Sequence, residues 1–260
     1  MRVGFLQFKP ELFHEKQNLE KISKMANNCR TDLLVLPELC TSGYLFTSKN
    51  KMEPISSTSD GRIPAFFKHI AKREDTAIVA GFLEKDGNQF YNSQICVDPS
   101  GAQTIYRKIH LFLNEKDLFS AGESGFKIAK YNDALLGLMV CFDWIFPESA
   151  RTLAVMGADI LCHSANLVLP FCQKAMITRS IENHVYSITC NRVGTEQNGD
   201  QSLTFTGMSQ IIDPEGNILA QANETDEVLM AVDIDSATAK NKMITEKNHL
   251  FRDRRKEFYE

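Results

Sequence analysis

The chain has 260 residues, of which 43% are hydrophobic and 24% are charged, values that are ordinary for a soluble globular protein. Its formal net charge of −4, without a dense run of Lys or Arg, argues against a nucleic-acid partner. No apolar stretch approaches the roughly 18 residues needed to span a bilayer, so we expect no membrane partner. Because no linker composition divides the sequence, we predict a single domain over residues 1–260.

The seven cysteines suggest neither a disulfide framework nor a zinc site, because their number is odd and no CxxC pair occurs. The residues after Met1 form a short strand pattern and lack the longer apolar core of a signal peptide. We therefore expect a cytoplasmic protein with free thiols.

The first 60 residues predict a strand, a helix and a second strand, followed by a long surface loop. This order, with both strands apolar, is typical of an α/β fold. Long loops in compact domains are often functional. The ranges are Arg2–Phe8 (strand), 14–28 (helix), Asp32–Leu36 (strand, ending on Pro37 and Glu38) and Thr41–Asp60 (loop).

Residues 62–107 add a helix and three strands. The last two strands alternate in polarity and are joined by the turn sequence Asp98-Pro99-Ser100-Gly101, so this hairpin makes the predicted sheet mixed. The ranges are Arg62–Arg73 (helix), Thr76–Leu83, Phe90–Val97 and Gln103–Arg107 (strands).

The stretch Ala134–Ala158 is the most informative part of the chain. Ala134–Val140 is an uncharged run that suits a strand buried on both faces. Cys141 follows, and Pro147–Met156 has a helical pattern with proline in its first turn. Cys141 should therefore lie at the carboxyl end of a strand, where open α/β sheets bind ligands, and the helix dipole should lower its thiol pKa. The alternative is a buried, inert cysteine.

The remaining sequence continues the alternation of strands and helices and ends in a highly charged peripheral segment. The ranges are Asp159–His163, Val185–Asn191, Met208–Ile212, Ile218–Ala222 and Glu227–Ile234 (strands), residues 173–184 (helix) and Phe251–Glu260 (charged end).

Three predicted strand ends carry a reactive residue: Glu38, Lys108 and Cys141. A thiolate nucleophile needs a group that moves its proton and a cation that offsets the charge, and a carboxylate and an ammonium supply these functions. Taken singly, Glu38 is also compatible with a helix cap and Lys108 with a solvated strand edge. Spacing alone does not show that the three meet.

Three blocks of sequence resemble the signature blocks of the nitrilase superfamily, the carbon–nitrogen hydrolases, in the same order and with similar separations. The blocks are Leu34-Val35-Leu36-Pro37-Glu38, Tyr106-Arg107-Lys108-Ile109-His110-Leu111-Phe112 and Cys141-Phe142-Asp143-Trp144. The resemblance covers nearly the whole chain, and it implies a four-layer α-β-β-α sandwich.

The resemblance also implies roles for individual residues. Cys141 matches the nucleophile, Glu38 the general base and Lys108 the residue that supports the oxyanion. The backbone N–H of Phe142 would be the second oxyanion donor, and Glu115 matches a second glutamate that orients the substrate and the lysine. The implied chemistry needs no metal and no organic cofactor.

Three further residues are candidates for the substrate pocket. Tyr44 lies in a loop that resembles a family substrate loop, Trp144 lies three residues after the nucleophile, and Asn166 follows another strand end. Trp144 is also compatible with a place in the core. Cys162 and His163 suggest a metal site only weakly, because neighbouring side chains of a strand point to opposite faces.

The resemblance extends to oligomeric state. The helices predicted at 147–156 and 173–184 resemble the pair that makes the subunit contact in homologous dimers. The Arg252-Asp253-Arg254-Arg255 run resembles a C-terminal end that reaches toward the partner subunit, although a solvated tail is equally compatible with its composition. We therefore expect a homodimer or a larger homo-oligomer.

The sequence thus predicts an amidase-type hydrolase that cleaves a small amide or carbamoyl substrate to a carboxylic acid and ammonia or an amine, through a thioester. A true nitrilase that attacks an aliphatic C≡N carbon is the alternative within the superfamily. Two other classes stay open at this point: a non-catalytic binding protein with the same fold, and a cysteine peptidase with a Cys–His dyad.

Overall fold

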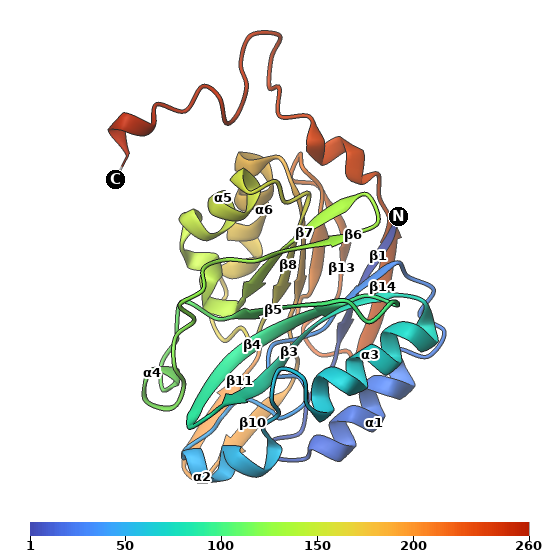
Figure 1. Ribbon diagram of the computed structural model, residues 1–260, viewed down its shortest axis with the longest axis vertical. Coiled ribbons are helices and arrows are strands. Elements are labelled where there is room, and N and C mark those ends of the chain that lie inside the picture. Colours follow the sequence, from blue (N-terminus) through green and yellow to red (C-terminus); the bar gives the residue numbers. More distant parts are fainter. Residues whose placement is uncertain (260) are drawn as a thin grey trace.

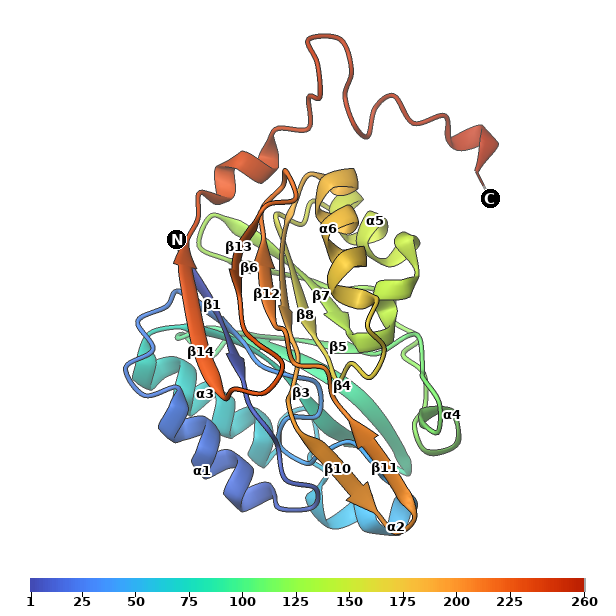
Figure 2. The same ribbon diagram turned by 180° about the vertical axis from the view of Figure 1, so that it is seen from behind.

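The computed structural model describes residues 1–259, which form two facing six-stranded sheets with helices on both outer faces (Figures 1 and 2). Helices α1 (Glu15–Met25) and α3 (Arg62–Glu74) cover one sheet, and α5 (Pro147–Val155) and α6 (Cys172–Asn183) cover the other. The predicted α-β-β-α sandwich is therefore confirmed. The single domain over residues 1–260 stays a prediction.

The first sheet has the strand order β14-β1-β2-β3-β4-β5. Its three central strands β1, β2 and β3 are parallel, whereas β14, β4 and β5 pair antiparallel, so the mixed sheet is confirmed. The bounds are β1 (Arg2–Gln7), β2 (Leu33–Val35), β3 (Ala77–Asp86), β4 (Gln89–Val97), β5 (Gln103–Arg107) and β14 (Val228–Asp233).

The second sheet has the strand order β13-β12-β9-β8-β7-β6, with β7, β8 and β9 parallel. The parallel strands are buried almost throughout, which explains why their sequences are continuous apolar runs. The bounds are β6 (Ile128–Tyr131), β7 (Ala134–Val140), β8 (Ile160–Ser164), β9 (Tyr186–Cys190), β12 (Gln210–Ile212) and β13 (Ile218–Gln221).

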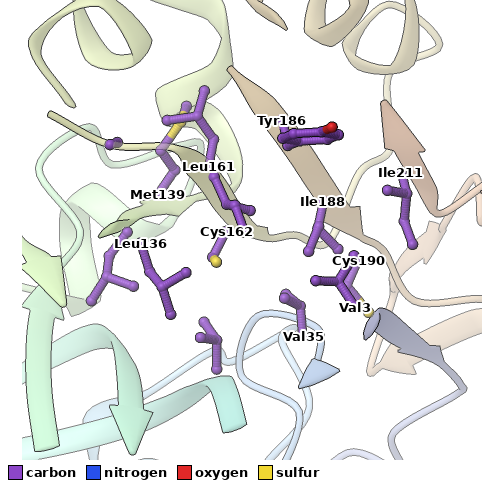
Figure 3. Close-up of a cluster of buried hydrophobic side chains, with 14 of the residues drawn as sticks. Val3, Val35, Leu136, Met139, Leu161, Cys162, Tyr186, Ile188, Cys190 and Ile211 are labelled. Atoms are coloured by element: carbon purple, nitrogen blue, oxygen red, sulfur yellow. The ribbon is translucent and has the colours of Figure 1, made fainter. Parts of the chain in front are cut away.

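The apolar core lies between the two sheets. Figure 3 shows Val3 and Val35 of the first sheet facing Leu136, Cys162 and Ile188 of the second. All five side chains are buried. Burial of such side chains stabilises the fold by about 1.5–3 kcal/mol each, so this layer holds the sheets together.

Polar side chains also link the two sheets, close to the ends of β2 and β8. The amide of Gln94 in β4 donates to Ser164 Oγ at 2.8 Å and to the Cys162 carbonyl at 3.1 Å. Ser164 Oγ donates in turn to the Leu36 carbonyl at 2.7 Å. These bonds fix the end of β2 relative to the end of β8, and both ends lead into the site described below.

Several short elements differ from the sequence prediction. The predicted surface loop Thr41–Asp60 contains the single turns α2 (Lys49–Met52) and η1 (Glu53–Ile55), and its first residues, 41–46, are buried, so its prediction as a surface loop is partly wrong. One turn is too short to show a helical period in sequence. The other unpredicted elements are β6, the polar hairpin β10 (Thr195–Asn198) and β11 (Gln201–Thr204), α4 (Glu115–Leu118), η2 (Cys141–Ile145), η3 (Ser236–Lys240) and η4 (Lys256–Phe258).

Candidate active site

Glu38 and Lys108 meet at the ends of two strands of the first sheet. Glu38 follows β2, Lys108 follows β5, and both side chains are fully buried. Lys108 Nζ donates to Glu38 Oε1 and to Glu115 Oε1, each at 2.8 Å. Glu115 is the first residue of α4, and its Oε2 accepts from the Phe112 N–H at 3.0 Å. The structure therefore brings Glu38, Lys108 and Glu115 together.

Asn92 in β4 belongs to this cluster, although the sequence analysis missed it. Its Nδ2 donates to Glu38 Oε1 at 2.7 Å and lies 3.4 Å from Glu115 Oε1. The sequence feature that could have indicated Asn92 is its carboxamide, which lies inside the predicted strand Phe90–Val97. Because Asn92 and Lys108 both bind Oε1, the other oxygen, Glu38 Oε2, is buried without a hydrogen-bond partner among residues 1–259.

A glycine in β3 allows the backbone of Glu38 to lie where it does. A Cβ atom at Gly81 would come within 2.5 Å of Glu38 Cα and 2.6 Å of the Leu39 nitrogen. Both contacts are with backbone that cannot rotate away. Gly81 is thus required by the close approach of β3 to the chain after β2.

Cys141 lies at the end of β7, in a backbone conformation that is unusual for a residue with a side chain. Its φ is +41°, in the left-handed region, and it begins the short helix η2. The thiol Sγ donates to the carbonyl of Asn166 at 3.8 Å. The N–H of the next residue, Phe142, forms no hydrogen bond to another described residue.

Asp143 ties the loop of Cys141 to the end of β5, a role that the sequence analysis did not assign. Asp143 Oδ2 accepts from the Val140 N–H at 2.9 Å and from the Tyr106 hydroxyl at 2.8 Å. Asp143 Oδ1 lies 2.7 Å from His110 Nδ1. Since Tyr106 and His110 flank Lys108 in sequence, this network couples the positions of Lys108 and Cys141.

The expectation that the helix dipole lowers the thiol pKa of Cys141 is wrong. Burial raises the pKa of Cys141 well above its ordinary value, and the negative charges of Glu38 and Glu115 raise it further. Lys108 opposes this effect without overcoming it. The α-helix α5 begins only at Pro147, beyond η2, so its dipole acts from a distance. The resting sulfur is therefore a neutral thiol.

The neighbouring ionisable groups are coupled to each other. Burial alone would lower the pKa of Lys108, but the carboxylates of Glu115 and Glu38 raise it above its ordinary value, so the lysine stays charged. Burial raises the pKa of Glu115, which Lys108 partly offsets. Burial and the same two carboxylates raise the pKa of Tyr44, whose phenol stays neutral.

The space beside Cys141 is small. A cavity of about 10 Å³ is lined by Cys141, Trp144 and Asn166 together with Phe112 and Leu169. This volume holds about one water molecule. Both polar atoms of the Asn166 carboxamide are buried without a hydrogen-bond partner among residues 1–259.

Tyr44 lines a second small space, which it shares with Glu115. This cavity of about 30 Å³ is bounded by Tyr44 and Glu115 and by Phe46, Leu113 and Phe119. The three predicted pocket residues are therefore divided between two neighbouring spaces.

None of the described histidines forms a hydrogen bond to Cys141 Sγ. His110 faces Asp143, and His163 Nε2 lies 2.9 Å from the main-chain carbonyl of Cys141. This geometry gives no Cys–His dyad. Within residues 1–259, no group of three His, Cys, Asp or Glu side chains could hold a metal ion, and no helix is both long and apolar enough to cross a membrane.

The chain is similar to known hydrolases in both sequence and fold. Residues 2–242 match the family described as Carbon-nitrogen hydrolase. The chain is 41% identical over 263 residues to a protein named nitrilase from Pyrococcus abyssi, covering 100% of this chain and 99% of that one. It is 34% identical over 240 residues to an (R)-stereoselective amidase from a Pseudomonas species, covering 90% and 85%.

A solved structure agrees with these relatives. The crystal structure of a carbon-nitrogen hydrolase from Helicobacter pylori matches the fold with a TM-score of 0.90, at 26% identity, covering 100% of this chain and 97% of that one. The chain belongs to the carbon-nitrogen hydrolase family of the nitrilase superfamily. It is accordingly a hydrolase that acts on carbon–nitrogen bonds.

Proposed function

We propose that the protein is an amidase-type hydrolase that cleaves a small amide or carbamoyl compound through a thioester at Cys141. The observation that carries this proposal is the arrangement around Glu38. Lys108 and Asn92 hold one carboxylate oxygen, and the other is a buried acceptor with no partner among the residues that the structure describes. Such an oxygen suits repeated proton transfer between sulfur, nitrogen and water.

In the first stage, Glu38 takes the thiol proton and Cys141 Sγ attacks the carbonyl carbon. The Lys108 ammonium and the Phe142 N–H stabilise the oxyanion that forms. When the carbonyl re-forms, the C–N bond breaks and the Glu38 proton passes to the leaving nitrogen, which departs as ammonia or an amine. The product is a thioester.

In the second stage, Glu38 takes a proton from water, and the hydroxide attacks the thioester carbon. The C–S bond breaks, the proton returns from Glu38 to sulfur, and the carboxylic acid leaves. Glu115 accepts a second hydrogen bond from Lys108, so the ammonium keeps a partner when the charge of Glu38 changes.

The side chain of Asn166 favours an amide over a nitrile. Its Oδ1 and Nδ2 have no hydrogen-bond partner in the described part of the chain, and it lines the same cavity as Cys141. An amide or carbamoyl group presents a carbonyl acceptor and N–H donors that match this pair. A nitrile presents one weak acceptor and leaves Oδ1 unsatisfied, at a cost of about 1–3 kcal/mol.

A true nitrilase is the second candidate, because the relative from Pyrococcus abyssi carries that name. Attack of Cys141 on a C≡N carbon would use the same three side chains and give a thioimidate. In that case the outcome depends on the shape of the pocket and on the fate of the tetrahedral intermediate.

We also propose that the protein forms a homodimer through α5 and α6. Val155 and Ile181 lie on these helices with 47% and 49% of their surface exposed. The C-terminal arm, residues 241–259, extends beyond the sheets on the side of α5 and α6 (Figures 1 and 2) and carries the exposed Phe258 and Tyr259. Exposed apolar side chains of this kind are typical of a surface that another copy covers.

The test is a screen for ammonia release with the wild type and Cys141→Ala in parallel, over small aliphatic amides, N-carbamoyl amino acids and aliphatic nitriles. We expect release from an amide or carbamoyl series, which the Cys141→Ala variant loses by about three orders of magnitude or more. Release from nitriles alone would favour the second candidate. Equal release by wild type and Cys141→Ala would refute the role of Cys141.

A further inference from the structure

His163 is a fully buried histidine at the site that the mechanism above does not use. It lies in β8, beside Thr189 of β9 in the parallel pairing of the two strands. Its Nε2 is 2.9 Å from the carbonyl oxygen of Cys141, and its Nδ1 is 3.2 Å from Thr189 Oγ1.

These two contacts define the tautomer of the ring. A carbonyl oxygen only accepts, so Nε2 carries the hydrogen and donates it to Cys141. Nδ1 is then the acceptor, and the Thr189 hydroxyl donates to it. Burial lowers the pKa of His163 to about 4, so the ring is neutral near neutral pH and keeps this single tautomer.

The ring approaches the Cys141 carbonyl from the side of the sheet that faces α5 and α6. Ser164, the next residue, points to the first sheet, since its Oγ donates to the Leu36 carbonyl. Neighbouring side chains in a strand point to opposite faces, so His163 points away from the first sheet. Glu38 and Lys108 belong to the first sheet and lie on the other side.

The carbonyl that His163 binds belongs to the same peptide group as the N–H of Phe142. A trans peptide is planar, and its C=O and N–H point in opposite directions. A donor on the carbonyl from the helix side therefore directs the N–H toward the side of Glu38 and Lys108. The left-handed φ of Cys141, +41°, is a conformation that surrounding contacts must hold.

We propose that His163 is a positioning residue that sets the direction and the strength of the Phe142 N–H as oxyanion donor. The carbonyl of Cys141 also lies at the start of η2, where hydrogen bonds of the 3₁₀ type have poor geometry, so the contact from His163 adds a well-aligned donor. A donor on the carbonyl polarises the peptide and strengthens its N–H in turn. This role rests on the proposed function of Cys141.

The test compares two reagents that modify the Cys141 thiol, of which only one forms an oxyanion. Acylation of Cys141 by 4-nitrophenyl acetate passes through a tetrahedral oxyanion, whereas alkylation by iodoacetamide displaces iodide at a saturated carbon and develops none. We compare His163→Phe, which keeps a ring but no donor, with His163→Gln, whose amide supplies a donor. Cys162→Ala is the packing control, because it removes side-chain volume from the same strand on the opposite face.

We expect His163→Phe to slow acylation about tenfold or more, while the rate of alkylation stays within about twofold of the wild type. Loss of one oxyanion donor typically lowers kcat by about 10²–10³, and this variant keeps the Phe142 N–H but misdirects it. His163→Gln should recover most of the acylation rate, and Cys162→Ala should change neither. Equal losses in both reactions, or an unchanged acylation rate, would overturn the role of His163. A wild-type Cys141 that reacts with neither reagent would instead remove the proposed function, and the role of His163 with it.

Discussion

At the scale of single residues, the site combines a neutral thiol with a charged lysine. Burial and two carboxylates hold the pKa of Cys141 high, so few molecules carry a thiolate at neutral pH. In the proposed mechanism the thiol therefore depends on proton transfer to Glu38 during the attack rather than on a resting ion pair. This differs from cysteines that are activated by a lowered pKa.

Glu38→Gln tests this distinction. The variant keeps an oxygen for Lys108 and Asn92 but cannot accept a proton, so turnover should fall by about 10²–10⁴. Because the charge of Glu38 raises the pKa of Cys141, its removal should lower that pKa, and the pH profile of alkylation by iodoacetamide should shift to lower pH. Both rates are measured on the same preparation from about pH 6 to 10.

Glu53→Gln, a change to a carboxylate of an exposed ion pair, is the matched control and should leave turnover and alkylation unchanged. If turnover and alkylation of Glu38→Gln fell in parallel, Glu38 would be holding the site together rather than moving protons. Turnover close to the wild-type rate would exclude Glu38 as the base.

At the scale of elements, the hairpin β10–β11 holds the loop that carries Tyr44. Glu196 in β10 accepts from the N–H groups of Tyr44, at 2.9 Å, and of Leu45, and it pairs with the fully buried Arg192. The Arg192 guanidinium also donates to the Pro10 carbonyl at 2.8 Å and stacks on Phe205 at 4.1 Å. The loop of Tyr44, which we propose to contact the substrate, is therefore anchored by one buried ion pair.

We expect Glu196→Gln to have two effects: it should destabilise the protein, and it should weaken the attachment of the loop that carries Tyr44. It leaves the buried charge of Arg192 without its partner, which typically costs about 3–5 kcal/mol in the free energy of unfolding. We expect that loss in urea unfolding, and a KM for the amide that rises more than kcat falls. Glu257→Gln, in an exposed pair with Arg255, is the control and should behave like the wild type. Unchanged stability would show that Arg192 finds another partner.

At the scale of the whole molecule, the sandwich leaves α5 and α6 with exposed apolar side chains. These helices lie beyond the second sheet, next to the C-terminal arm (Figure 2). Phe251, in the middle of the arm, packs under Arg151 of α5, with 5.3 Å between the guanidinium and the ring centroid. The arm therefore contacts α5, and we propose that the arm and the two helices form one surface for a second copy.

The Val155→Lys, Ile181→Lys double variant tests this surface. Gel filtration with light scattering should give at least twice 29.4 kDa for the wild type and 29.4 kDa for the variant, because two desolvated charges oppose association. Leu113→Lys changes a 56% exposed apolar residue away from these helices and should keep the wild-type mass. A wild type that elutes as a monomer would contradict the proposed dimer.

The local sequence determined the fold class and the residue types of the site. Buried parallel strands such as Leu33–Val35 and Ala134–Val140 must be apolar throughout, so they stand out in sequence, and Glu38, Lys108 and Cys141 follow such strands or the hairpin beside them. The family resemblance rests on these same blocks. One-turn elements and the polar hairpin β10–β11 carry no apolar period and were not predicted.

Only the tertiary structure decided how these residues act on one another. Asn92 lies far from Glu38 in sequence, and His163 lies far from Cys141. Asp143 is close to Cys141 in sequence, but nothing in the sequence indicates its contact with Tyr106. Each of these contacts depends on which strands pair and on which face each side chain takes. The pKa of Cys141 depends on burial between two sheets, which no local pattern records. Chemical type is a property of the local sequence, whereas distance, burial and charge environment arise only when separate strands pack together.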